Sequence, residues 1–445
     1  MFHATLRHLR VIGVFLCLTS LIAAAPARAV TLLRDADIEY ALKQLGDPVL
    51  RAAGLSPSQV RILVIDDSTL NAFIVDTQHI FIHSGLLTKL DSAAQIQAVI
   101  AHEAAHIANG HIARRLGNMR TARTAAGLGM VLAAAAAAAG NGQAAVGLGI
   151  GVQSSAMRNF LAHTRAEEAS ADISSIRYLV QAGIDPQGAI EVQELFRGQD
   201  ALAESRQDPY MRTHPLSRDR LRALQGLVAG ASARTAPDPA GDYWFARAKG
   251  KLTAFTRAPS WTLRRADDSL TPDIAQMRRA VAYHRQSDLG RALSNIDAAI
   301  TARPNDPFLR DLKGQILLES RRASDAVKVY SAAARLAPRE PLILGGLGRA
   351  QLAAGNPREA LKSLEAARGR DFSDTRIMRD LATAYAQTGQ NAMASLLTAE
   401  RYAVQGRFKD AAIHATRAEG ALARGSGPWQ RAQDVLSAAQ RAGQR

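Results

Sequence analysis

The pattern of apolar residues between positions 92 and 117 predicts an amphipathic helix. Ile96, Val99 and Ile107 recur at the three- and four-residue spacing that places side chains on one helical face. Ser92, which a glutamine follows three residues later, is typical of the residue that caps the start of a helix. We therefore expect this helix to pack one face against a hydrophobic core.

Short apolar runs before this helix favour β-strands. Residues 60–65 and 73–75 are rich in β-branched and aromatic side chains, and residues 79–82 repeat that pattern after a polar turn at 76–78. The sequence predicts a small hairpin or sheet in a domain that is otherwise helical. An edge strand can pair with the extended backbone of a bound polypeptide, so the hairpin is either purely structural or part of a substrate site.

The second half of the chain repeats with a period of 34 residues. Small residues recur at this spacing in three registers: Ala292, Ala326, Ala360 and Ala394; Ala280, Gly314, Gly348 and Ala382; Ala299, Ala333 and Ala367. Small side chains at fixed positions let two helices approach closely, which is the tetratricopeptide pattern of stacked helix pairs. Four units are expected to begin near residues 273, 307, 341 and 375. Such an array either binds protein segments on its concave face or braces a neighbouring domain.

These patterns divide the chain into four parts. Residues 1–29 have a basic start, an apolar stretch and a small-residue cleavage site, which predicts a signal peptide cleaved after Ala29. An uncleaved anchor is the alternative. Residues 30–230 form the first domain, and residues 231–270, which begin with Ala, Gly, Ser and Pro, are predicted to be a linker. Residues 271–445 hold the repeats.

Composition narrows the possible functions. The single cysteine, Cys17, lies in the predicted signal peptide, so the exported chain has no thiol for disulfides, catalysis or metal binding. Removal of that peptide takes away three arginines and no acidic residue, which lowers the formal charge from +15 to +12. No basic residues interleaved with aromatic ones accompany this charge. Nucleic acid is therefore not expected as a partner, whereas acidic partners and anionic membrane surfaces are compatible with the charge.

The most specific motif is His102-Glu103-Ala104-Ala105-His106, within the predicted helix. Histidines four residues apart lie on one helical face, and two neutral imidazoles there can bind one Zn²⁺. Glu103 lies close enough to take a proton from a water on that ion. A catalytic zinc site needs a third protein ligand and keeps one position open.

Candidates for the third ligand follow in residues 165–172. Glu168 and Asp172 are one helical turn apart, so Glu168 can bind the ion while Asp172 accepts the N–H of a ligating histidine. The alternative is a charged helix face with ordinary ion pairs. Further along, Pro215 favours an extended loop at His214. From such a loop His214 can donate to a developing oxyanion or occupy the open coordination position.

In their order these motifs resemble the signature of the gluzincin peptidases that include the CAAX prenyl proteases, HtpX and soluble periplasmic relatives. The signature in this chain is H-E-x-x-H, then E-x-x-A-D, then T-H-P-x-x-x-x-R, and the stretch from Asn71-Ala72-Phe73 onward is similar to the family's hairpin. The resemblance covers residues 33–230. With the repeats included, it extends to the BepA-type periplasmic metalloproteases.

The resemblance implies the role of each motif residue. His102, His106 and Glu168 would bind one zinc ion per chain, with Glu103 as the general base. His214 would be the family's loop histidine, acting on catalysis, and Arg220 the arginine after it, near the ligands. Asn71, Ala72 and Phe73 would lie where substrate binds. The expected fold is an α+β zincin-like metalloprotease domain, mostly helical with a small hairpin or sheet, followed by an all-α tetratricopeptide superhelix.

Two further expectations concern residues near the motif. His111 lies five residues after His106, about 140° around a continuous helix, and is expected to face away from the metal site. Residues 124–157 carry no charge and are mostly Ala and Gly. Their longest apolar run is short for a bilayer span. We expect a helical hairpin or lid beside the zinc, with peripheral membrane contact and a true span as alternatives.

The sequence therefore favours an exported, periplasmic zinc endopeptidase. The resemblance implies that it acts on misfolded or misassembled envelope proteins, in the quality control of outer-membrane proteins. Its repeats would recruit such substrates or the outer-membrane assembly machinery. The alternative is a tetratricopeptide scaffold or assembly chaperone whose metal site is rarely active.

Overall fold

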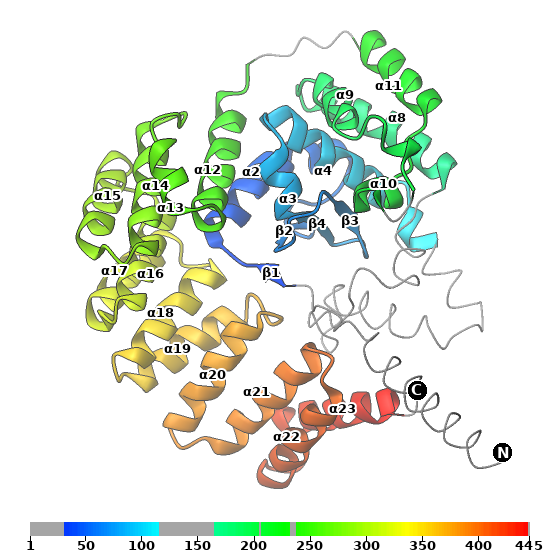
Figure 1. Ribbon diagram of the computed structural model, residues 1–445. Helices are drawn as coiled ribbons and strands as arrows, with labels where there is room; N and C mark the ends of the chain where they lie inside the picture. Colours follow the sequence, from blue (N-terminus) through cyan, green and yellow to red (C-terminus); the bar gives the residue numbers. More distant parts are fainter. Residues whose placement is uncertain (1–30, 115–163, 204–205, 232–236, 444–445) are drawn as a thin grey trace, which may run out of the picture.

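The computed structural model describes residues 31–114, 164–203, 206–231 and 237–443. In these residues the chain forms a mostly helical α+β domain followed by an all-helical array, which confirms the predicted fold class (Figure 1). The predicted signal peptide, residues 1–29, and the uncharged segment 124–157 lie outside the described residues.

A four-stranded sheet lies in the first domain. Its strands are β1 (Leu32–Leu33), β2 (Arg61–Ile65), β3 (Ala72–Ile74) and β4 (His79–His83), in the order β1-β2-β4-β3. β3 and β4 form the predicted hairpin, with Phe73 opposite Phe81, whereas β2 runs parallel to β4. β3 is therefore an edge strand of the sheet.

Helices pack against one face of this sheet and around it. They are α2 (Ala36–Ala52), α3 (Ser84–Lys89), α4 (Ala93–Ala108), α8 (Arg165–Gln181), α9 (Gln187–Glu194), the 3₁₀ turn η1 (Gln199–Ala201), α10 (Pro209–Thr213) and α11 (Arg218–Gly230). Ile96, Val99 and Ile100 of α4 are buried in one core with α2 and with Ile80 and Ile82 of β4. The predicted apolar stripe thus fixes which face of α4 remains for the polar residues.

The range 231–270, predicted to be a linker, instead contains two helices. They are α12 (Pro239–Thr256) and α13 (Pro259–Arg264). Phe245 and Leu252 of α12 are buried in the core of the first domain, while Tyr243 packs with residues of the first repeat. The proline that suggested a linker, Pro239, occupies the first turn of α12, where a missing backbone N–H costs nothing. α12 therefore joins the two domains as a packed element.

The C-terminal helices form pairs that begin where the 34-residue period predicts. The units are α14 (Pro272–Arg285) with α15 (Leu289–Ala302), α16 (Pro307–Glu319) with α17 (Ala323–Leu336), α18 (Pro341–Ala353) with α19 (Pro357–Arg368), and α20 (Thr375–Gln387) with α21 (Asn391–Val404). α22 (Phe408–Ala421) and α23 (Gly427–Gly443) extend the array. A Cβ at Gly348 would overlap the side chain of Leu364 on the paired helix, which explains the small residues at this register.

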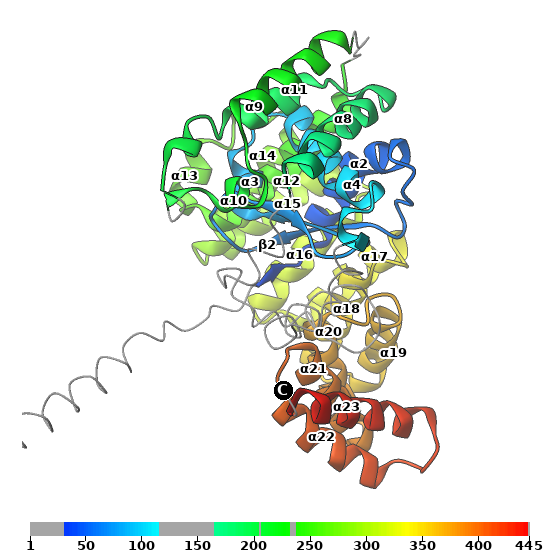
Figure 2. The same ribbon diagram turned by 90° about the vertical axis from the view of Figure 1, so that its right-hand side faces the viewer.

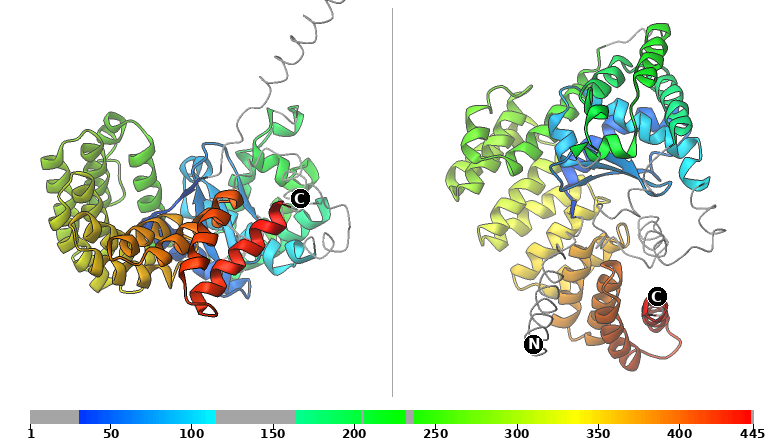
Figure 3. Two further views of the ribbon diagram at one scale, coloured as in Figure 1. Left: turned by 90° about the horizontal axis from the view of Figure 1, so that it is seen from below. Right: turned by 45° about the vertical axis from the view of Figure 1, so that its right-hand side comes forward.

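The array begins beside the first domain and curves below it, and α22 and α23 lie at its far end (Figures 2 and 3). α14 packs on α12, and α16 packs on α2. Ala36 of α2 is buried against Phe308 of α16 and Ile343 of α18. The repeats are therefore not a separate unit beyond a flexible linker but pack directly on the first domain.

Buried ion pairs also join the two domains. Arg34, between β1 and α2, lies 2.7 Å from Asp371 and 3.1 Å from Asp374, in the connection between α19 and α20. Arg247 of α12 lies 2.7 Å from Asp37 of α2 and also contacts Asp306 before α16. Burial alone would raise the pKa of Asp371, but the Arg34 guanidinium outweighs it and holds that pKa well below its usual range. Removal of one partner would leave the other charge uncompensated.

We expect Asp371→Asn to destabilise the docked structure by about 3 kcal/mol at neutral pH, the low end for a broken buried pair, because Arg34 retains other carboxylates. Folding depresses this carboxyl pKa, so its contribution is present above about pH 4 and is lost as the pH falls further. Urea unfolding of the wild type and of Asp371→Asn, at pH 7 and at acid pH, measures the difference in their free energies of unfolding.

The matched control is Asp325→Asn on α17, whose ion pair with Arg322 is exposed. It should leave stability close to that of the wild type, because an exposed ion pair contributes little. Equal losses in the two variants at pH 7 would contradict the assignment of the Asp371 pairs to docking.

Candidate metal centre

α4 carries both motif histidines on the side that faces α8. Ser92 caps the helix, because its side chain accepts the backbone N–H of Gln95 at 3.2 Å. His102 and His106 are both buried, one turn apart. Their Nε2 atoms approach each other to 3.1 Å. The two imidazoles therefore present their outer nitrogens to one point.

α8 brings a carboxylate to the same point. Thr164 and Glu167 form a capping box that fixes its first turn. The Oε2 atom of Glu168 lies 3.3 Å from His102 Nε2, and its Oε1 atom lies 3.3 Å from His106 Nε2. One turn later, Asp172 Oδ1 lies 3.3 Å from the other ring nitrogen of His102, Nδ1.

The connection between α10 and α11 completes the cluster. α10 ends at Thr213, and His214 follows it with its ring fully buried. His214 Nδ1 lies 3.0 Å from Glu168 Oε1, and its Nε2 lies 3.2 Å from the backbone oxygen of Ala72. Arg220, in the first turn of α11, contacts Asp172 at 2.6 Å and Glu168 at 2.6 Å. α11 thereby holds both carboxylates of α8.

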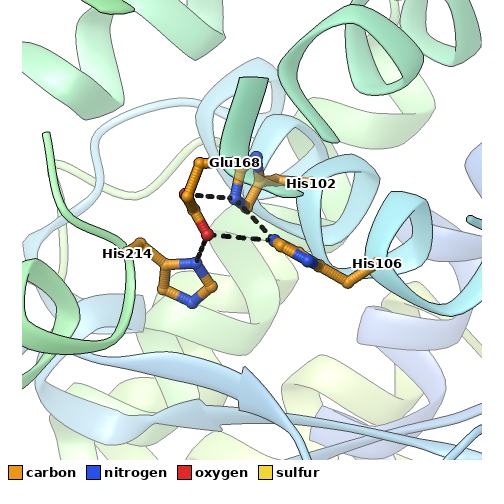
Figure 4. Close-up of side chains that lie close together, drawn as sticks. All are labelled: His102, His106, Glu168 and His214. Atoms are coloured by element: carbon orange, nitrogen blue, oxygen red, sulfur yellow. Dashed lines mark hydrogen bonds and ion pairs between the residues drawn. The ribbon is translucent and has the colours of Figure 1, made fainter. Parts of the chain in front are cut away.

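Figure 4 shows the side chains of His102, His106, Glu168 and His214 turned toward one another. One ligand atom from each lies within 4.8 Å of the others. A tetrahedral zinc ion with bonds of about 2.0 Å has ligand atoms about 3.3 Å apart. The separations of 3.1 and 3.3 Å among the first three residues match that figure. These donors therefore fit a tetrahedral metal ion.

Charge balance also fits a divalent cation. Among the described residues of the site, Glu103, Glu168 and Asp172 bring three buried carboxylates, and Arg220 brings one guanidinium. When all four groups are ionised, their net charge is −2. Burial alone would lower the pKa of His102, but its contacts with Asp172 and Glu168 outweigh burial and raise that pKa to about 10. The surroundings thus stabilise positive charge at this point.

Glu103 is a buried carboxylate with unused lone pairs. Its side chain is 0% exposed, and among the described residues neither of its oxygens accepts a hydrogen bond. Its Oε1 lies 3.3 Å from His214 Nε2. Burial raises the pKa of this carboxyl group. A carboxylate in this state is suited to accept a proton.

The three residues predicted to bind substrate lie beside the cluster, at and just before β3. The N–H of His83 donates to the carbonyl of Asn71, and Phe73 is paired with Phe81. In an antiparallel ladder the intervening residue, Ala72, then directs its N–H and C=O away from β4, toward the edge of the sheet. His214 meets the Ala72 carbonyl on that edge.

Two contacts of the site were not predicted. His111, expected to face away, instead places its Nδ1 2.8 Å from the Nδ1 of His106. α4 ends at Ala108 and Gly110 has φ of 69°, so the helix assumed in that prediction does not continue. The ring of Tyr210 packs on that of His214 with centroids 4.7 Å apart. In the sequence, Gly110 was a signal for the turn that brings His111 back, whereas no pattern indicated the contact of Tyr210.

Comparison with known proteins agrees with this geometry. Residues 37–228 match the model of peptidase family M48, and residues 317–379 match a tetratricopeptide repeat. The chain is 24% identical over 392 residues to a protein of Escherichia coli (strain K12) named Beta-barrel assembly-enhancing protease, covering 85% of this chain and 78% of the relative.

A second group of relatives matches the first domain. The mitochondrial metalloendopeptidase OMA1 of Schizosaccharomyces pombe is 30% identical over 192 residues, which cover 42% of this chain and 52% of the relative. Its human counterpart is 24% identical over 181 residues, covering 40% of this chain and 34% of the relative. The chain is thus a metalloendopeptidase whose first domain is a peptidase family M48 domain, and a tetratricopeptide-repeat domain follows it.

Proposed function

We propose that this chain is an exported zinc endopeptidase that cleaves misfolded or misassembled proteins of the cell envelope. The observation that carries the proposal is the buried Glu103 carboxylate, which lacks a hydrogen-bond partner among the described residues and lies beside a cluster fit for a metal. A buried carboxylate whose oxygens accept no hydrogen bond is costly unless it serves a function.

His102, His106 and Glu168 would hold the zinc ion. Two imidazoles favour zinc over magnesium or calcium, which prefer oxygen ligands. When bound, the ion polarises the scissile carbonyl and acidifies water. Asp172 orients the His102 ring through Nδ1, and Arg220 holds Asp172 and Glu168 in place. These two residues act on the site through the ligands.

Glu103 is proposed as the general base. Its position one residue after His102 keeps it on the same helix as the ligands, and its free oxygens can accept the proton of the attacking water. The raised pKa makes it a stronger base than an exposed carboxylate. It would then deliver that proton to the leaving amine.

The edge of β3 is proposed to bind the substrate backbone. An extended polypeptide can add to this edge by pairing with the N–H and C=O of Ala72, with Asn71 and Phe73 on either side. The Nε2 atom of His214 lies within hydrogen-bond distance of the Ala72 carbonyl oxygen, so a substrate strand can pair there only if this imidazole moves. The same imidazole contacts Glu168, which supports a role for His214 as a gate.

The proposed setting is the periplasm, where the chain would act after cleavage of its signal peptide behind Ala29. The printed name of the Escherichia coli relative refers to assembly of β-barrels, which supports a role in quality control of outer-membrane proteins. No helix of the described residues is long and apolar enough to cross a membrane. Peripheral membrane contact through residues 124–157 remains part of the proposal.

A second function, as a scaffold or assembly chaperone with a rarely active metal site, is favoured by one observation. A cavity of 420 Å³ lies where the repeats face β1 and α2. Asp311, Tyr330 and Arg349 line it with charged and polar groups. It offers the repeats a place to hold a polypeptide segment of a substrate or of the outer-membrane assembly machinery.

Purified chain is expected to hold about one zinc ion, and the double variant His102→Ala/His106→Ala to hold none, because two of three ligands are lost. Elemental analysis measures the zinc content. His284→Ala, which removes a histidine paired with Glu319 in the repeats, is the control and should keep the metal. Unchanged zinc in the double variant would refute the ligand assignment.

Glu103→Gln is expected to lower cleavage of an unfolded protein substrate by about 10²–10⁴-fold, because the amide cannot accept the proton. Zinc content and thermal unfolding should stay as in the wild type, since Glu103 is not a ligand. Glu194→Gln, at an exposed ion pair on α9, is the control for loss of one carboxylate. Wild-type cleavage by the Glu103 variant would remove this residue from the mechanism.

His214→Ala is expected to raise proteolysis if the imidazole restrains the resting site, which we favour because it contacts both Glu168 and the Ala72 carbonyl. If His214 instead stabilises the oxyanion, its loss should lower kcat by about 10²–10³-fold. The measurement is steady-state cleavage of an unfolded substrate by both proteins. Unchanged kinetics would exclude both roles.

A further inference from the structure

The ring of His106 has a second neighbour, on the side away from the cluster. Its Nε2 atom faces His102 and Glu168, while its Nδ1 atom lies 2.8 Å from the Nδ1 atom of His111. His111 is only 2% exposed. A nitrogen–nitrogen distance of this length between imidazoles is that of a hydrogen bond.

The chain reaches this arrangement by ending one helix and turning. Asn109 caps α4, and its side-chain amide donates to the hydroxyl oxygens of Ser170 and Ser174 on α8, at 3.0 and 3.2 Å. Gly110 then adopts φ of 69°, which L-residues rarely adopt. This turn brings His111 back beneath His106, whereas five residues of continuous helix would have carried it away.

The contact fixes where the protons lie. Two Nδ1 atoms at this distance share one hydrogen, so one ring donates and the other accepts. If His106 offers the lone pair of Nε2 to a metal, its own proton must be on Nδ1. His106 is then the donor and His111 the acceptor, which places the proton of a neutral His111 on Nε2.

We propose that His111 is a positioning residue for the metal centre, which accepts the Nδ1–H of His106 and so keeps the Nε2 lone pair of that ligand directed at the ion. The inference rests on the proposed ligation by His106. It completes a pattern, since the Nδ1 of His102 faces the carboxylate of Asp172. Outer partners of this kind orient ligating histidines and set their tautomer.

The two ligands are supported by different chemistry. Asp172 brings a negative charge to His102, whereas His111 presents a ring nitrogen to His106. A carboxylate in place of His111 would change the summed charge of the site from −2 to −3, beyond what one divalent ion balances. An imidazole therefore orients His106 without adding charge to the site.

The test uses two variants of the full-length, zinc-loaded chain. His111→Asn keeps an acceptor, because the asparagine side-chain oxygen takes the place of the ring Nδ1. His111→Leu has similar bulk and no acceptor. Zinc release to an excess of a chromogenic chelator should be about 10–100-fold faster for His111→Leu than for the wild type. His111→Asn should stay close to the wild type.

A role in packing alone predicts the reverse order, since leucine suits a buried position better than asparagine does. Thermal unfolding of the metal-free proteins therefore accompanies the release rates, with His284→Leu in the repeats as the control. Wild-type release by His111→Leu, or equal acceleration in both variants, would overturn the proposal. A wild-type chain that binds no zinc would contradict the proposed function as well as this inference. The two outcomes named before would contradict the role of His111 alone.

Discussion

The carboxylates of Glu168 and Asp172, one helical turn apart on α8, determine how the rest of the site is arranged. Glu168 contacts His102 and His106 of α4 as well as His214, and Asp172 contacts His102. Buried carboxylates are costly unless they are paired, so α8 can lie only where α4 offers imidazoles and α11 offers Arg220. The ion pairs that offset the cost of burying these carboxylates also direct the metal-binding atoms toward one point. The fold of the domain and the geometry of its metal site therefore follow from one set of contacts.

A comparable constraint sets the position of the repeats. Arg247 of α12 contacts Asp37 in the first domain and Asp306 in the array, and its side chain is almost fully buried. Separation of the two domains would return these charges to water, but it would also expose the apolar faces around Ala36 and Phe308. The hydration that the charges would regain offsets much of the loss of their ion pairs, so the buried apolar faces favour the docked arrangement most clearly. A polypeptide held in the cavity of the array is thus held beside the domain that carries the catalytic site, which agrees with both proposed activities of the chain.

The sequence predicted those parts of the structure that repeat or that follow helical spacing. The histidines of α4 and the small residues of the repeats have fixed periods, so their faces could be assigned before the structure was known. The turn at Gly110 has no period, and the assumption of a continuous helix misplaced His111. Composition misled the prediction at α12, where Pro239 begins a helix instead of interrupting one. Arg34 and Asp371 pair although they lie 337 positions apart, and no local sequence pattern predicts such a contact.

His214 connects the metal site to the substrate edge, and the energies involved are small. In the proposed mechanism its Nε2 leaves the Ala72 carbonyl when a substrate strand pairs there, and its Nδ1 leaves Glu168 as the ring moves. A neutral hydrogen bond contributes about 1 kcal/mol net, and one to a carboxylate about 1.5–3 kcal/mol. The two or three backbone hydrogen bonds of a substrate strand along β3 are therefore of the same size as the resting contacts of His214 that they replace. The ring of Tyr210 opposes the motion by stacking on His214, so the balance depends on how extended the substrate is. Such a gate would open for an unfolded strand and stay closed toward a folded surface, because only the former can pair with an edge strand.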